Sequence, residues 1–125
     1  MTEAPQPTVV WAEIPVTDLD AATTFYSAVL QATLTTEMQG PNLVTGLPGG
    51  GSSGGHLYVG TPAARGTGPS VHLGVPGALE DAMERARVAG AEVISPPIPM
   101  PFGRFAYIID PDGNSIGLFE PAAAS

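Results

Sequence analysis

The sequence predicts an α+β fold made of two βαβββ modules. An internal repeat is the first observation that predicts it, because residues 11–34 align with residues 70–93 at a constant offset of 59 (70 − 11). Residues 55–58 also align with residues 116–119, at an offset of 61 (116 − 55). The halves therefore match at both their starts and their ends, and a site between them is expected.

The first half predicts one helix among strands. Residues 9–16 are apolar and β-branched, which favours a strand, and Pro15 limits its pairing at one end. Thr17 followed by Asp20 resembles a capping box that opens a helix. One face of this helix is expected to pack on a sheet, because apolar residues recur at helical spacing: Leu19, Ala22, Phe25, Tyr26, Val29 and Leu30. Three short strands are expected next, over 33–38, 42–47 and 56–60.

The second half repeats this order. Its helix places Leu79, Ala82, Met83 and Ala86 inward, and Gly90 is placed to end it in a left-handed conformation. Strands are expected over 92–95, 104–110 and 115–120. The last two are separated by the turn 110–114 (DPDGN), where Pro fixes φ and Gly and Asn tolerate positive φ. Residues 96–101 (PPIPMP) favour a stiff extended segment that can edge a cavity.

A length of 125 residues suits one domain with one core. The glycine-rich stretch 49–55 is expected to form a flexible loop. We expect a single domain over residues 8–121, comprising module one (8–60), a linker (61–69) and module two (70–121), with a disordered N-terminus (1–7) and a tail (122–125).

The charge balance excludes several partners. The chain has 12 acidic residues, four arginines and no lysine, for a net charge of −8, which argues against nucleic acid and anionic membranes. No apolar stretch approaches the ~18 residues of a membrane-spanning helix, and the start lacks the order of a secretory signal, so a cytoplasmic protein is expected. The absence of cysteine excludes disulfides and thiolate chemistry. Acid–base chemistry must therefore use His56, His72 or carboxylates.

Three motifs together carry a family resemblance. They are EIPVTDLD (13–20) followed by Phe25-Tyr26, the helix exit RVAGAEV (87–93), and DPDGNSIGLFEP (110–121). With these motifs the chain resembles the vicinal oxygen chelate superfamily, which includes glyoxalase I, extradiol dioxygenases and bleomycin-resistance proteins. The resemblance implies two βαβββ modules whose curved antiparallel and mixed sheets form a shared cavity, commonly in a homodimer.

The resemblance also implies a metal ligand on the first and last strand of each module, at Trp11, His56, Ser70 and Gly117. Only His56 coordinates metals strongly, so we expect the usual metal centre to be lost and no metal cofactor to be needed. A divalent metal at a shifted site is the alternative. Glu13 and His72 lie two residues further along their strands on the same face, and with His56 they supply two imidazoles and a carboxylate. Otherwise Glu13 and His72 line the cavity as polar groups, and His56 is partly exposed beside a loop.

Our first interpretation is a metal-free small-molecule-binding protein that captures an apolar or aromatic ligand. The expected ligand contacts are Trp11, His56, Ser70, Arg104, Phe105, Tyr107 and Phe119. Arg104 is expected either to meet an anionic group of the ligand or to pair with a surface acid. Glu120 should face away from the cavity, because its strand parity is opposite to that of Gly117.

The competing interpretation is an enzyme, either a glyoxalase-like lyase or isomerase or a dioxygenase. Glu13 or His72 is then the catalytic base and must point into a ligand-sized cavity. A third possibility is that a partner subunit supplies the missing groups across a dimer interface.

Overall fold

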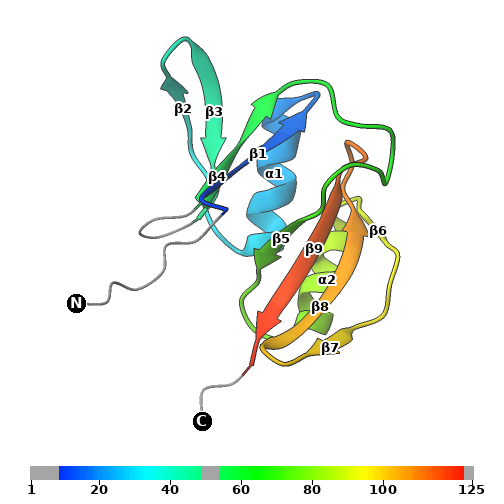
Figure 1. Cartoon of the computed structure of the whole chain (residues 1–125). Coiled ribbons are helices and arrows are strands. Elements are labelled where there is room, and N and C mark those ends of the chain that lie inside the picture. Colours follow the sequence, from blue (N-terminus) through cyan, green and yellow to red (C-terminus); the bar gives the residue numbers. More distant parts are fainter. Residues whose placement is uncertain (1–8, 49–53, 123–125) are drawn as a thin grey trace, which may run out of the picture.

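The computed structural model describes residues 9–48 and 54–122, and Figure 1 shows their arrangement. Module one contains β1 (Trp11–Val16), α1 (Leu19–Leu30), β2 (Thr36–Gln39), β3 (Asn42–Gly46) and β4 (Gly54–Val59). Module two contains β5 (Val71–Gly74), α2 (Leu79–Val88), β6 (Glu92–Val93), β7 (Ile98–Met100), β8 (Gly103–Ile109) and β9 (Ser115–Pro121). The βαβββ order predicted for each half is confirmed, and the proline-rich segment forms the additional short strand β7.

Each module has its own sheet, in the order β1-β4-β3-β2 and β5-β9-β8-β6, with β7 also paired to β8. The first and last strands of each module are parallel neighbours. Ile14 lies opposite Leu57 in module one, and Leu73 lies opposite Leu118 in module two. The sequence offsets of 59 and 61 relate these two pairs (73 − 14 and 118 − 57). The repeat in the sequence is therefore also a repeat of strand register.

The two helices cover one face of the sheets and contact each other, so both modules share one core (Figure 1). The fully buried side chains with the largest volumes include Tyr26, Leu57, Leu79, Ile108, Ile116 and Leu118. Arg85 of α2 donates two hydrogen bonds, of 3.1 and 3.2 Å, to the carbonyl of Val29 near the end of α1. This guanidinium stabilises carbonyl groups that a helix end leaves without partners, and it links the modules.

The predicted capping box at Thr17 is wrong. Asp18 is the N-cap of α1, and its carboxylate accepts a hydrogen bond from the backbone N–H of Ala21. Thr17 instead donates from both its N–H and its hydroxyl to Asp112, which belongs to the turn before β9. The hydroxyl that local spacing assigned to the cap thus bonds to a residue 95 positions away in the sequence. Gly90 follows α2 with a φ of 114°, as predicted.

The turn 110–114 binds module two to module one. Asp110 is buried and accepts a hydrogen bond from the hydroxyl of Tyr26, at 2.5 Å. The side-chain amide of Asn114 donates to the carbonyl of Pro15, at 2.8 Å. With the bonds of Asp112 to Thr17, three residues of one turn hold the end of β1 and the middle of α1.

Part of the predicted glycine loop is a strand. Residues 49–53 of that stretch lie outside the described residues, as do the predicted disordered N-terminus and residues 123–125, but Gly54 and Gly55 begin β4. A Cβ at Gly55 would overlap the carbonyl oxygen of Ala12, so a glycine lets β1 and β4 approach. The two sheets remain open and do not close on one another (Figure 1). No helix among the described residues is long and apolar enough to cross a membrane.

Candidate functional site

Side chains alternate between the helix-covered face of each sheet and the opposite face, which we call the open face. On β1, Ile14 and Val16 are buried toward α1, whereas Trp11 and Glu13 alternate with them on the open face. The same alternation on β8 buries Ala106 and Ile108 and leaves Phe105 and Tyr107 half-buried. All the aromatic site residues predicted from the sequence lie on the open face: Trp11, Phe105, Tyr107 and Phe119.

A hydrogen-bonded chain of three side chains occupies the open face of module one. Trp11 Nε1–H donates to His56 Nδ1 at 3.1 Å, and His56 Nε2 lies 3.0 Å from Glu13 Oε2. His56 and Glu13 are direct neighbours on β4 and β1. The rings of Trp11 and Tyr58 both meet the imidazole edge-on, with centroids 5.7 and 6.2 Å away. His56 is only 5% exposed, so the expectation that it is partly exposed is wrong.

A cluster of rings occupies the open face of module two. The His72 ring meets Phe105 and Tyr107 edge-on, with centroids 5.1 and 5.7 Å away, and these two rings are 5.2 Å apart. Phe119 lies opposite Phe105 on the neighbouring strand. The imidazole lies directly over Gly117, where an added Cβ would overlap it. His72 therefore covers the backbone at the position where the resemblance implied a metal ligand.

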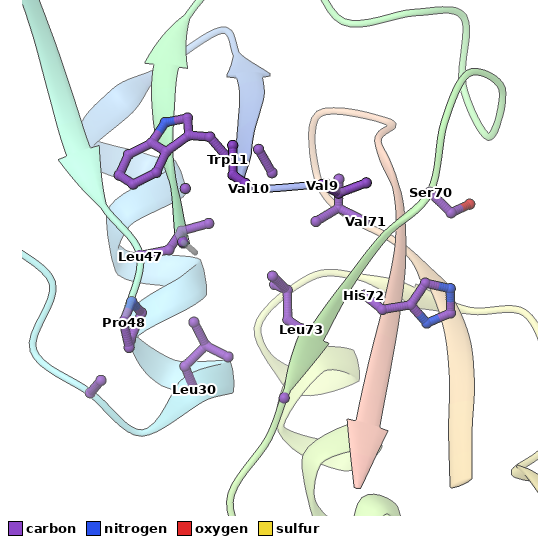
Figure 2. Close-up of a pocket in the computed structure, with 15 residues that line it drawn as sticks. Val9, Val10, Trp11, Leu30, Leu47, Pro48, Ser70, Val71, His72 and Leu73 are labelled. Atoms are coloured by element: carbon purple, nitrogen blue, oxygen red, sulfur yellow. The ribbon is translucent and has the colours of Figure 1, made fainter. Parts of the chain in front are cut away.

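A cavity of about 470 Å³ lies between the modules, a size typical of small-molecule sites. Figure 2 shows the residues that line it. Leu30, Leu47 and Pro48 line it from module one, and Val71 and Leu73 line it from β5. The lining also includes Trp11, Ser70 and His72. The indole of Trp11 extends toward module one and the imidazole of His72 toward module two (Figure 2). The cavity between the modules is thus mainly an apolar space with one polar group on each flank.

A second cavity, of about 480 Å³, lies in module one between the β2–β3 hairpin and the open face of β1 and β4. Glu13, His56 and Tyr58 line one side. The remaining lining comes from β3, the end of β4 and the hairpin turn: Gln39, Pro41, Asn42, Leu43, Val44 and Val59. We call it the hairpin cavity. Nothing in the sequence pattern indicated it, because it depends on where the hairpin lies relative to β1 and β4 in the folded sheet.

The predicted site residues are therefore divided among three places. Trp11, Ser70 and His72 adjoin the cavity between the modules, and Glu13 and His56 line the hairpin cavity. Phe105, Tyr107 and Phe119 form the ring cluster with His72. Each candidate base, Glu13 or His72, adjoins a cavity of ligand size, but the two bases lie at different cavities.

Arg104 lies away from these groups. Its guanidinium binds Glu80 of α2 with two bonds of 2.7 Å and Glu120 of β9 at 2.6 Å. The hydrogen bonds from Arg104 lower the pKa of Glu80 to about 2 and lower the pKa of Glu120. Glu120 also accepts a bond from the N–H of Leu79 at the start of α2, on the helix-covered side. Arg104 thus pairs with carboxylates, the second of the two outcomes the sequence left open, and Glu120 faces away from the open face.

The residues do not fit a metal centre of the kind the resemblance implied. Trp11, Ser70 and Gly117 occupy three of the four positions, and none of them is a strong ligand. At the shifted site Glu13 and His56 meet, but His72 does not join them. Across residues 9–48 and 54–122, no three His, Asp or Glu side chains converge closely enough to hold an ion.

A family model that matches most of the chain shows which family it belongs to. The model described as "Glyoxalase/Bleomycin resistance protein/Dioxygenase superfamily" matches residues 8–118. The chain belongs to this superfamily. A comparison with curated proteins gives no match.

Solved structures of the superfamily share the fold. A glyoxalase/bleomycin resistance protein from Albidiferax ferrireducens T118 superposes with a TM-score of 0.69 at 18% identity, covering 93% of this chain and all of that one. A glyoxalase/bleomycin resistance protein/dioxygenase family enzyme from Burkholderia phytofirmans PsJN gives 0.65 at 18% identity, covering 90% and 97%. TnmS3, an antibiotic binding protein from Streptomyces sp. CB03234, gives 0.60 at 24% identity, covering 96% and 100%. At these identities the likeness shows the fold alone.

Proposed function

We propose that this chain is a metal-independent small-molecule-binding protein that captures a planar apolar or aromatic ligand. The observation that carries the proposal is the replacement of coordinating side chains by ring surfaces. An indole occupies one ligand position, and at another a glycine leaves room for the imidazole of His72 over the strand, beside two aromatic rings.

Ring surfaces of this kind select a ligand by shape and stacking. An aromatic pair contributes about 0.5–1.5 kcal/mol beyond the burial of its area, so a few such contacts favour planar ligands over flexible ones. The apolar cavity between the modules adds a space of ligand size beside Trp11 and His72. Capture requires only this fit, and it needs no reacting group. TnmS3, described as an antibiotic binding protein, has a similar fold, which supports the same general role here.

We further infer that the protein acts in the cytoplasm as a homodimer. The sheets of one chain do not close, and large apolar side chains are exposed on the open faces of both modules, with Trp11 at 50% and Met100 at 38%. A second copy that covers the open faces would remove this surface from water. Sedimentation velocity of the full chain tests this part directly: a single species with the mass of one chain would contradict it.

The capture proposal is tested with the only tryptophan of the chain as reporter. A panel of planar polycyclic compounds is titrated into the protein, with Trp11 emission and calorimetry read in parallel. We expect saturable one-to-one binding, weakened about tenfold by Trp11→Ala. Phe102→Ala is the matched control, since Phe102 is 72% exposed and lines neither cavity. Stoichiometric Fe, Zn, Mn or Ni in protein purified without added metal would overturn the metal-independent proposal.

A further inference from the structure

The chain of Trp11, His56 and Glu13 fixes which hydrogen-bonding groups face the hairpin cavity. An indole N–H only donates, so His56 Nδ1 must accept and the imidazole proton must sit on Nε2. Nε2–H then donates to Glu13 Oε2. The imidazole is neutral in this arrangement, and both of its nitrogens are occupied. Of these three hydrogen-bonded side chains, Glu13 presents its carboxylate to the cavity, and its side chain is 63% exposed.

No arginine or lysine of the protein neutralises this carboxylate. The chain has no lysine, and all four arginines are described. Arg65 binds Glu92, Arg87 binds Glu84, and Arg104 binds Glu80 and Glu120. Arg85 donates to the carbonyl of Val29. With a net charge of −8, the surrounding field attracts cations and offers Glu13 no positive partner among these side chains.

The rest of the hairpin cavity suits an amphipathic cation. Val44 supplies an apolar wall, and the rings of His56 and Tyr58 lie beside the carboxylate. Gln39 and Asn42 add neutral amides at the hairpin. A cation is favoured beside aromatic rings and by a charge-assisted hydrogen bond to a carboxylate that is already oriented.

We propose that the hairpin cavity is a second binding site, which takes a protonated amine carried on a planar apolar body. The ammonium group bonds to Glu13, and the body lies along Val44 and Tyr58. His56 is a positioning residue that holds the carboxylate through Nε2–H. This rests on the proposed function, the capture of planar ligands, and adds to it a second site with its own charge class of ligand.

Calorimetric titration with a matched pair of probes tests the proposal. Naphthalen-2-ylmethanamine is a cation at neutral pH, and naphthalen-2-ylmethanol has nearly the same shape without charge. We expect the amine to bind the wild-type protein about tenfold or more tightly than the alcohol, because a hydrogen bond to a charged group contributes more than a neutral one. Raising the salt concentration should weaken binding of the amine and leave the affinity of the alcohol unchanged.

Two variants assign this preference to its residue. Glu13→Gln removes the charge but keeps an oxygen that accepts from His56 Nε2–H, so the fold is retained and the amine-to-alcohol ratio should fall to within about twofold. Glu84→Gln changes the net charge equally on the outer surface of α2 and should leave the ratio unchanged. Equal binding of both probes by the wild-type protein, or a ratio that Glu13→Gln does not reduce, would overturn the amine site while leaving capture of planar ligands standing. Failure of both probes to bind at millimolar concentration would count against both proposals.

Discussion

At the scale of single residues, Gly117 shapes the open face of module two because it has no side chain. The imidazole of His72 occupies the space above Gly117 and is held there by edge-on contacts with Phe105 and Tyr107. Gly117→Ala should therefore destabilise the protein by about 1–3 kcal/mol, because the new methyl group forces the ring out of its contacts. A urea-denaturation double-mutant cycle with His72→Ala checks it: the cost of Gly117→Ala should fall by at least half once the ring is gone. An unchanged cost would show that the strand backbone, and not His72, excludes the methyl group.

A second residue-scale prediction concerns the buried hydroxyl of Tyr26. It donates to Asp110, a carboxylate that is 1% exposed and also accepts from the backbone N–H groups of Asp112 and Asn114. Tyr26→Phe keeps the ring and removes one donor to a buried charge, so it should lower the free energy of unfolding by about 1.5–3 kcal/mol. Tyr107→Phe alters a half-buried tyrosine of the open face and should change the free energy of unfolding by less than about 0.5 kcal/mol. Equal effects of the two variants in urea denaturation would contradict the assigned role of the hydroxyl.

The same tyrosine predicts an alkaline limit to stability. Burial, and then the charge of Asp110, raise the pKa of Tyr26 well above its ordinary value of 10.0. Above about pH 10 the unfolded chain releases this proton while the folded chain keeps it, so the free energy of unfolding falls as pH rises from there. Denaturation midpoints at pH 8 and pH 11 should separate more for the wild-type protein than for Tyr26→Phe. Parallel curves for the two proteins would show that Tyr26 ionises as easily in the folded state as in the unfolded one.

At the scale of elements, α2 is tied to its sheet by Arg104 of β8, which bridges Glu80 of the helix and Glu120 of β9. The hydrogen bonds of Arg104 lower the pKa of Glu80 from 4.5 to about 2. The stabilisation from this pair is therefore complete above about pH 4.5 and is lost as pH falls toward 2. Arg104→Gln should lower the urea midpoint at pH 6, and the gap between wild type and variant should narrow at pH 2.5. A gap that stays constant across this range would mean that Arg104 acts through packing alone.

The elements themselves were largely predictable from sequence. Alternation along β1 and β9 predicted which side chains share a face, because a period of two leaves no choice of face once one side is buried. The faces of Phe105 and Tyr107 on β8 were left open by the sequence. The helix cap was not predictable in the same way. Thr17 and Asp18 are both good cap residues, and the choice between them is made by Asp112, which only the folded chain brings near. The sequence of residues 110–114 likewise predicts a turn between two strands. It does not predict that this turn joins the modules, because that role depends on contacts with Tyr26 and Pro15.

At the scale of the whole molecule, the repeat predicted two equivalent modules but not the distribution of the site. The offsets place Glu13 and His72 at equivalent positions, and the sequence suggested that they converge with His56. In the structure each belongs to its own sheet, and the two sheets do not close, so Glu13 meets His56 while His72 meets Phe105 and Tyr107. Strand register is a property of one module and can be inferred from its residues. The angle between the modules depends on long-range contacts such as that of Arg85 with Val29, which no local pattern encodes.

The loss of coordinating side chains predicts a molecule whose stability does not respond to divalent metals. A ligand that binds only the folded state stabilises it according to its concentration relative to Kd, so 100 µM of a metal with a Kd of 1 µM would add about 2.7 kcal/mol. For a chain of this size that would raise Tm by about 10 °C. We expect Ni²⁺, Mn²⁺ or Fe²⁺ at 100 µM, added after treatment with a chelator, to shift Tm by less than about 1 °C. Of the four positions that the resemblance implied, His56 alone carries a strong ligand, and Trp11 and Glu13 already occupy both of its nitrogens. A rise of several degrees that His56→Gln abolishes would instead show that the hydrogen-bonded chain opens to admit an ion.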